Sequence, residues 1–224
     1  MLENIRYFLF LGIILYLISS IPIAYIWVKI KNRELNLTQI GTGNLGASNT
    51  KNVSGIPSAV SVALIDAIGK GFIPIYILSN FSEYSWELFF YGLIIVFGHN
   101  WSIFMNFKGG RGIAVSIGIL LAIDPLRITF LIIAIPVVVG RWILYKDSAL
   151  WTFVTIILLN VITFSISAEI IEKVFTVGLA ILLIGKRILS NEYSFPKQLN
   201  KFEVFMCRII FDRDIRSKYL WINK

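Results

Sequence analysis

The chain has 224 residues, of which 57% are hydrophobic, and its mean hydropathy is +0.77. This apolar share exceeds the roughly 45–50% of a soluble domain, so the composition indicates an integral membrane protein. The formal net charge is +8, which in membrane proteins usually reflects cytoplasmic loops facing anionic lipid rather than a nucleic-acid site. The single cysteine, Cys207, excludes an intrachain disulfide framework and a multi-cysteine metal site. We expect no metal, no cofactor and no nucleic-acid partner.

Long apolar segments dominate the sequence. A membrane span needs about 20 mainly apolar residues, sometimes about 17. The sequence therefore predicts an all-α, polytopic integral membrane protein with about seven transmembrane helices, at residues 5–29, 56–79, 84–98, 112–124, 126–145, 149–167 and 170–189. The fourth segment is short and is expected to form a tight hairpin with the fifth through "IDPLR", where Pro125 ends one helix and opens the next. The first segment lacks the flanks of a cleaved signal peptide and is interpreted as a retained span.

The distribution of positive charge predicts the topology in the cell membrane. Lysine and arginine gather in four regions that fall on one side, namely residues 30–55, 99–111, 141–148 and the tail from Lys186. The opposite side carries only Arg6, Arg127 and Lys173. By the positive-inside rule, the loops and the C-terminus are cytoplasmic and the N-terminus is outside.

The chain is expected to divide into a membrane-embedded domain, residues 1–190, and a basic cytoplasmic tail, residues 191–224. The tail mixes aromatic and basic residues. Two interpretations are open: it lies along the cytoplasmic leaflet, or it is a solvated basic end.

The first loop contains the glycine-rich motif "IGTGNLGASN" at residues 40–49. Glycine permits positive φ and close approach of backbone N–H groups to an anion, so the motif is a candidate phosphate cradle. The alternative is an ordinary turn beside a span. A nucleotide-binding loop is not indicated, because the Gly-Lys-Ser/Thr ending and flanking β–α pattern are absent.

The second motif is "GHNWSIFMNFKGGRG", residues 98–112. Lys108 and Arg111 flank Gly109 and Gly110, so two cations and free N–H groups can converge on one anion. The alternative is that the cations are only anchors at the lipid headgroups. His99, the single histidine, stands at a helix mouth, where it could bond an anion or take a proton near neutral pH.

Two further candidates lie inside predicted spans. Asp66 and Lys70 share a helix face at i, i+4 and can pair. Ionisable residues in the bilayer usually mark function, although a salt bridge that only fixes packing is the alternative. The nearby glycines and Pro74 indicate a local helix break. Ser20, in "SSIPIAY", is either a packing contact or a ligand.

These motifs occur in the same order and at similar separations as in the acyl-phosphate-dependent glycerol-3-phosphate acyltransferases of bacterial membranes, the PlsY type, which the chain resembles over roughly residues 12–190. The resemblance implies seven spans, an external N-terminus, and transfer of a fatty acyl group from acyl phosphate to glycerol 3-phosphate in phospholipid biosynthesis. The positions that match the family's pattern are Ser20, Gly43, Asn44, Gly46, Asn49, His99, Lys108, Gly109, Gly110 and Gly112.

Several positions depart from that pattern. Arg111 and Thr42 are mild changes, whereas Asn36 and Thr38 replace an acid and a cation. Ser102 stands for a proline and Val115 for a threonine, and the spacing from Asp66 to Lys70 is one residue longer. Of the family's last-span motif, only Arg187 and, out of register, Glu192 are kept.

We predict His99 and Lys108 as the catalytic residues, Lys108 binding the acyl phosphate head and His99 accepting the hydroxyl proton. Substrate-binding roles are assigned to Ser20, Gly43, Asn44, Gly46, Asn49, Asp66, Lys70, Gly109, Gly110, Arg111 and Glu192. The expected partners are acyl phosphate, glycerol 3-phosphate and membrane lipid. No Ser-His-Asp arrangement is present, so catalysis by positioning two anionic substrates is expected. The alternative is a transporter-like or non-catalytic membrane protein with a degenerate anion site.

Overall fold

The computed structural model describes residues 2–40, 43–81, 85–166, 169–190, 199–217 and 220. Its contacts divide the chain into two compact units, Met1–Asp124 and Pro125–Lys224. The expected division near residue 190 stays a proposal. No strand occurs among the described residues, which confirms the predicted all-α class.

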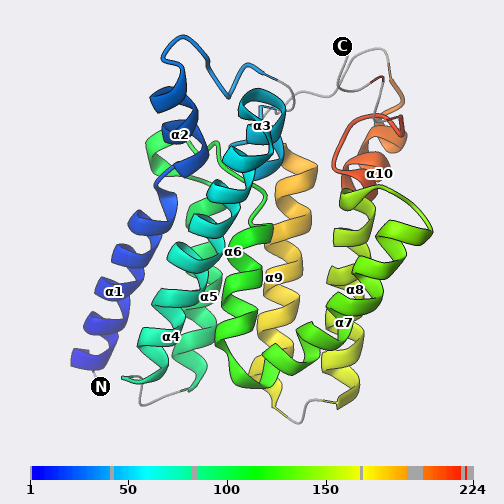
Figure 1. Cartoon of the computed structure of the whole chain (residues 1–224). Coiled ribbons are helices and arrows are strands. Elements are labelled where there is room, and N and C mark those ends of the chain that lie inside the picture. Colours follow the sequence, from blue (N-terminus) through cyan, green and yellow to red (C-terminus); the bar gives the residue numbers. More distant parts are fainter. Residues whose placement is uncertain are drawn as a thin grey trace. The chain divides into compact units, whose positions relative to one another are not determined.

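Every regular element described in the first unit is a helix (Figure 1). In chain order they are α1 Leu2–Ser20, α2 Ile23–Lys31, α3 Ala47–Leu64, the π-helix η1 Ile65–Phe72, α4 Ile73–Ser79, α5 Ser85–Asn100, the short 3₁₀ helix η2 Ile103–Met105 and α6 Ile113–Ala122. Helix α1 packs along α5, and α6 packs along η1.

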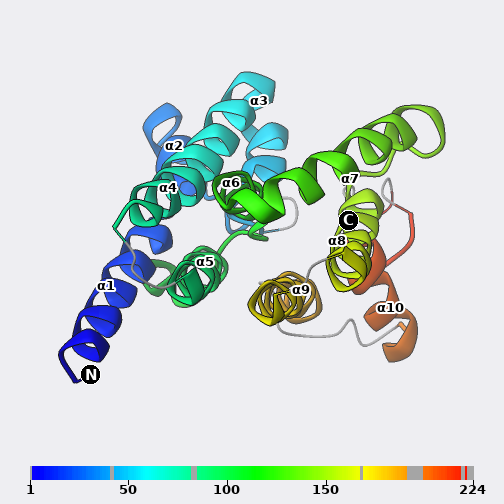
Figure 2. The same cartoon turned by 90° about the horizontal axis from the view of Figure 1, so that it is seen from below.

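The second unit contains α7 Asp124–Ile143, which opens at the boundary residue, α8 Ser148–Ile166, α9 Ile170–Leu189 and α10 Lys201–Phe211. Helices α8 and α9 lie side by side, and α10 packs against both (Figures 1 and 2). The break expected at "IDPLR" is present, because α6 ends at Ala122 and α7 begins at Asp124.

The predicted spans correspond to helices of unequal length. Within the part of the chain that the structure describes, five helical stretches are long and apolar enough to cross a membrane, at Ile5–Lys31, Ala47–Ser79, Trp86–Met105, Leu126–Ile143 and Ser148–Ile166. Helix α6 is apolar but has only 10 residues. Helix α9 has 20 residues and carries charged side chains near both ends.

The first apolar stretch is broken between α1 and α2 at Ile21 and Pro22. Pro22 has no N–H and disfavours a helical conformation at the residue before it, so the helix cannot run through. Two carbonyls freed by the break accept hydrogen bonds from side chains of later segments. Ser102 Oγ donates to the Ser20 carbonyl, and Lys70 Nζ donates to the Ile21 carbonyl. The break is thus stabilised by side chains from elsewhere in the unit.

The helix break expected near Asp66 and Lys70 does not occur, because α3, η1 and α4 follow one another without a gap; both residues lie in η1, which winds as a π-helix. Helix α6 approaches η1 so closely that a Cβ built on Gly118 would overlap the Ala67 carbonyl, and one on Gly71 would overlap the Val115 carbonyl. Glycine at these contacts lets the two backbones touch. Val115 is fully buried in this packing.

Candidate active site

The two glycine-rich motifs meet in the first unit. The Leu45 N–H, in the first motif, donates to the Gly109 carbonyl at 3.3 Å. The Gly110 N–H donates to the His99 carbonyl at 3.1 Å, at the end of α5. Residues that are far apart in the sequence therefore form one joined backbone region.

The glycine pair of the second motif is required by close packing. A Cβ on Gly109 would overlap the carbonyls of His99 and Asn100, and a Cβ on Gly110 would overlap the His99 Nε2. The sequence alone suggested that these glycines free the backbone for an anion. The structure adds that only glycine lets this segment lie against the end of α5.

The first motif is held by side chains around it. Gly43 has φ of 63°, and a Cβ there would lie 3.0 Å from the Thr38 carbonyl oxygen. Asn49 is buried and donates from Nδ2 to the carbonyls of Leu37 and Ile40 at 3.1 and 2.9 Å. Gly46 is the N-cap of α3. The Asn49 side chain thus ties the start of α3 to the loop before it.

Asn36 and Thr38, which replace an acid and a cation of the family's pattern, form an uncharged turn. Asn36 Oδ1 accepts hydrogen bonds from the Thr38 N–H at 3.1 Å and from Thr38 Oγ1 at 2.8 Å. This local bonding is typical of asparagine-led turns. It stabilises the loop without charge.

Asn44 offers an unused polar atom in the same region. Its side chain is 6% exposed, and its Oδ1 has no hydrogen-bond partner in the part of the chain that the structure describes. Buried polar atoms are normally paired, so an exception needs an explanation such as a bound ligand.

The cations of the second motif differ in environment. Arg111 is buried, with 7% of its surface exposed, and lies directly after the packed glycine pair. Lys108 is half-buried. Across the described ranges, its ammonium has no hydrogen bond or ion pair with a protein group. The Lys108 ammonium is therefore available to a ligand.

Asp66, Lys70 and His99 form a buried polar group beside these loops. Lys70 Nζ lies 2.9 Å from Asp66 Oδ1, which confirms the predicted pair, and His99 Nδ1 lies 3.7 Å from the same oxygen. All three side chains are nearly inaccessible. The carboxylate lies between two basic groups, so burial of its charge is compensated locally.

Ser20 links the broken first span to α5. Its Oγ donates to the Gly98 carbonyl at 3.2 Å, and its own carbonyl accepts from Ser102. This contact fits the packing interpretation of Ser20. In the sequence, Ser102 was noted only as a departure from proline. In the structure its hydroxyl donates to the Ser20 carbonyl, which the helix break leaves without a helical partner. The replacement of proline by a residue that can donate a hydrogen bond was the available sequence signal.

The structure thus brings together Ser20, Gly43, Asn44, Gly46, Asn49, Asp66, Lys70, His99, Lys108, Gly109, Gly110 and Arg111 within the first unit. Glu192 and residues 41 and 42 lie outside the described residues.

Arg187, kept from the last-span motif, belongs to the second unit. It is 2% exposed and donates to the carbonyls of Ile209 at 2.8 Å and Ala149 at 3.1 Å. In this chain Arg187 holds the C-terminal helix. Sequence reasoning missed this role, because the carbonyls that the arginine binds carry no sequence signal.

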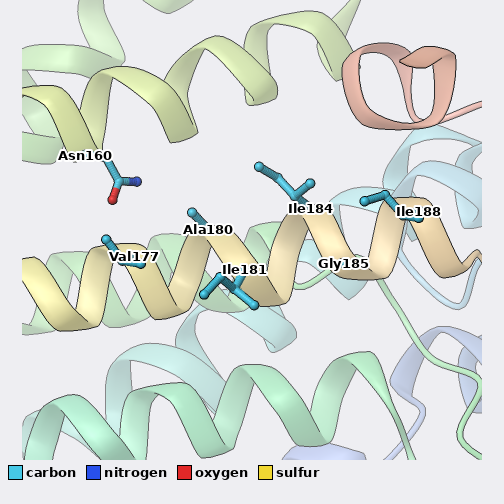
Figure 3. Close-up of a pocket in the computed structure, with 7 residues that line it drawn as sticks. All are labelled: Asn160, Val177, Ala180, Ile181, Ile184, Gly185 and Ile188. Atoms are coloured by element: carbon cyan, nitrogen blue, oxygen red, sulfur yellow. The ribbon is translucent and has the colours of Figure 1, made fainter. Parts of the chain in front are cut away.

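A separate groove of about 440 Å³ lies in the second unit along α8 and α9 (Figure 3). It is lined mainly by aliphatic side chains, including Val177, Ile181, Ile184 and Ile188. Asn160 points into it from α8 (Figure 3) and donates to the Ile156 carbonyl. None of the site residues predicted from the sequence lines this groove.

Comparison with known proteins identifies the chain's relatives. A family model described as glycerol-3-phosphate acyltransferase matches residues 9–192. The chain belongs to this family.

Curated relatives agree with the family assignment. Glycerol-3-phosphate acyltransferase 5 of Dehalococcoides mccartyi is 28% identical over 223 residues, covering 97% of this chain and 93% of the relative. The enzyme of a Thermoanaerobacter species is 34% identical, covering 76% and 84%. That of Aquifex aeolicus is 40% identical, covering 52% and 60%.

The fold also matches a solved structure, the glycerol 3-phosphate form of PlsY, an integral membrane glycerol 3-phosphate acyltransferase. The TM-score is 0.69 at 30% identity, covering 81% of this chain and 88% of that one. The chain is therefore a multi-pass membrane transferase of this family. These findings do not favour the transporter-like or non-catalytic alternative.

Proposed function

We propose that the protein transfers a fatty acyl group from an acyl phosphate to the 1-hydroxyl of glycerol 3-phosphate. The products are 1-acylglycerol 3-phosphate and inorganic phosphate, an early step of phospholipid biosynthesis. The observation that carries the proposal is the Leu45–Gly109 hydrogen bond, which joins the two glycine-rich motifs beside His99 and the uncommitted Lys108. The names of the relatives and the solved glycerol 3-phosphate and lysophosphatidic acid forms of PlsY support the acceptor.

The joined loops suit the phosphate head of the donor. Lys108 and Arg111 supply positive charge there, whereas the backbone N–H groups of Gly43, Leu45, Lys108 and Gly110 are bonded to protein carbonyls and hold the loops in place. Phosphate is bound well by such fixed cations. The acyl chain would then lie between the helices.

Asn44 suits the acceptor substrate. Its unpaired Oδ1 can accept a hydrogen bond from a hydroxyl. Glycerol 3-phosphate offers two hydroxyls, so this contact would orient the 1-hydroxyl while cations reduce repulsion between the two anionic substrates.

The transfer needs no covalent enzyme intermediate. The acceptor oxygen forms a bond to the acyl carbonyl carbon, the bond from that carbon to the phosphate oxygen breaks, and phosphate leaves with the bonding electrons. The hydroxyl proton passes to His99 or to a substrate phosphate oxygen. Packing of the His99 Nε2 against Gly110, with Asp66 facing Nδ1, supports the phosphate route, with His99 positioning the glycine segment.

The proposed topology places both motifs in the cytoplasm, where glycerol 3-phosphate is soluble and available. The N-terminus would be outside. The positive-inside distribution of lysine and arginine supports this orientation.

The test uses purified protein in lipid nanodiscs with palmitoyl phosphate and glycerol 3-phosphate, scored by phosphate release and by acylated product. Palmitoyl coenzyme A is the donor control and dihydroxyacetone phosphate the acceptor control. We expect turnover only with the acyl phosphate and glycerol 3-phosphate pair. Turnover with the coenzyme A ester would overturn the donor assignment, and a preference for the other acceptor would overturn the acceptor assignment.

A further inference from the structure

The C-terminal helix α10 is fixed to the membrane helices by two arginines that cap each other's helix. Arg187, on α9, donates to the Ile209 carbonyl in the last turn of α10. Arg208, on α10, donates to the Ile188 carbonyl in the last turn of α9 at 2.9 Å. Carbonyls at helix C-termini lack partners within the helix and favour positive charge. The C-terminal ends of α9 and α10 are therefore joined.

Other contacts place this junction at the α7–α8 loop. Arg187 also donates to Ala149, in the first turn of α8. Arg213 pairs with Asp147 of that loop at 2.8 Å, and Arg208 pairs with Asp214 at 2.6 Å. Helix α10 thus lies level with the end of α7, the start of α8 and the end of α9 (Figure 1).

The same level carries exposed aromatic residues typical of a membrane–water boundary. Trp142 is 70% exposed and Tyr145 is 46% exposed, at the end of α7 and in the loop bonded to Arg213 through Asp147. Tryptophan and tyrosine gather where hydrocarbon gives way to headgroups. The α7–α8 loop therefore marks the edge of the bilayer.

Helix α10 presents an apolar stripe away from α8 and α9. Phe202 is 70% exposed, and Phe205 and Met206 are each 37% exposed. Their i, i+3, i+4 spacing puts them on one helix face. Val204 and Arg208, on the opposite face, are buried. The outward face is thus unusually apolar for a helix end in water.

We propose that the outward face of α10, defined by Phe202, Phe205 and Met206, is a membrane-interface surface that inserts into the leaflet at this end of α8 and α9. Helix α10 lies at the same level as Trp142 and Tyr145, so its outward face meets the same boundary between lipid and water as these two residues. An amphipathic helix in this position buries its apolar face about 5–10 Å into the boundary between headgroups and acyl chains. The protein would gain an anchor beyond its spans, in the segment that follows the family match at residue 192.

The test exploits the single cysteine. Cys207→Ser removes it, and Phe205→Cys or Glu203→Cys then places one spin label on the stripe or away from it. Glu203 is exposed and lies about 160° around the helix from Phe205. Phe202→Cys is a second stripe position, used if Phe205→Cys lowers the melting temperature. The full-length labelled proteins are placed in nanodiscs of phosphatidylethanolamine and phosphatidylglycerol.

The readout is the collision rate of each label with oxygen, which concentrates in lipid, and with a water-soluble nickel chelate. We expect the oxygen-to-nickel ratio to be at least about threefold higher at 205 than at 203, as for a side chain about 5–10 Å deep. Equal ratios would place the stripe in water and overturn the proposal. A label at 205 that is immobilised and shielded from both reagents would show that protein covers the stripe, and would overturn it as well.

Discussion

Two clusters of cations in this protein are used in opposite ways. At the C-terminal end, Arg187, Arg208 and Arg213 are all bonded to helix-end carbonyls or carboxylates. At the paired glycine loops, Lys108 has no protein partner among the described residues, and the neighbouring Asn44 keeps a buried acceptor unused. The first cluster stabilises the fold, whereas the second is available to a ligand.

The difference teaches how to interpret charge in a membrane protein. A buried cation must be compensated, so an arginine with carbonyl partners has its structural explanation already. Lys108, which lies beside the packed glycine segment without such a partner, has no structural explanation of this kind. Removing a residue from the first cluster should cost stability, and removing one from the second should cost activity.

The largest expected effect is at Lys108. Lys108→Ala should lower kcat/KM for acyl phosphate by about 10²–10³-fold, the usual cost of losing one fixed group that stabilises developing charge. The melting temperature should stay the same, because the ammonium bonds no protein group in the described ranges. Phosphate-release assays and thermal melts measure the two effects. Lys146→Ala, an exposed lysine in the α7–α8 loop, is the control and should retain activity. Wild-type turnover in Lys108→Ala would remove this site from the mechanism.

Arg187→Ala should show the opposite behaviour. It leaves the carbonyls of Ile209 and Ala149 without their donor, which should lower the free energy of unfolding by about 2–4 kcal/mol. Thermal melts and limited proteolysis of the C-terminal segment report the loss. Arg141→Ala, an exposed arginine at the end of α7, should change neither measurement. A stable Arg187→Ala protein that has lost turnover would place Arg187 with the catalytic cations instead.

Gly110→Ala tests whether the glycine pair is needed for close packing. The methyl group would overlap the His99 Nε2, and relief of the overlap would cost about 1–3 kcal/mol and displace the backbone segment that carries Lys108. We expect kcat/KM to fall by about 10–100-fold, consistent with that cost. Gly185→Ala on α9 is the matched control, because no heavy atom lies within 4 Å of its added Cβ. Equal behaviour of the two variants would show that Gly110 is not under packing constraint.

The smallest effect concerns pH and the C-terminal cluster. Burial tends to raise the pKa of Asp147, but the hydrogen bond from Arg213 and the backbone N–H groups of Ala149 and Leu150 outweigh it, so the pKa lies below its ordinary value. A carboxyl with a lowered folded-state pKa contributes stability above its unfolded pKa and loses it as pH falls through the folded pKa. Docking of α10 should therefore weaken only in the acidic range below the ordinary aspartate pKa.

A spin label on Cys207, in α10, measures this weakening, because its mobility should rise as α10 loses its docking contacts at acidic pH. Asp147→Asn should abolish the acidic transition of the label. A transition of the same size in Asp147→Asn would assign the pH dependence to another group.

Much of the architecture could be predicted from the sequence. Apolar length and composition indicate membrane helices, because the bilayer demands them wherever the chain crosses. The i, i+4 spacing predicted the Asp66–Lys70 pair, because helix geometry brings those positions together. The two glycine motifs were recognisable as a pair by their residue types.

Only the tertiary structure decided what each of these groups contacts. Spacing could not predict that Lys70 and Ser102 satisfy the carbonyls freed at the break before Pro22, or that Gly110 lies against His99. It could not distinguish Arg187, which is bound to carbonyls, from Lys108, which is left for a ligand. Every residue has a backbone carbonyl, so residue types cannot predict which carbonyl a buried cation will bind. That is decided only when the fold brings distant segments together.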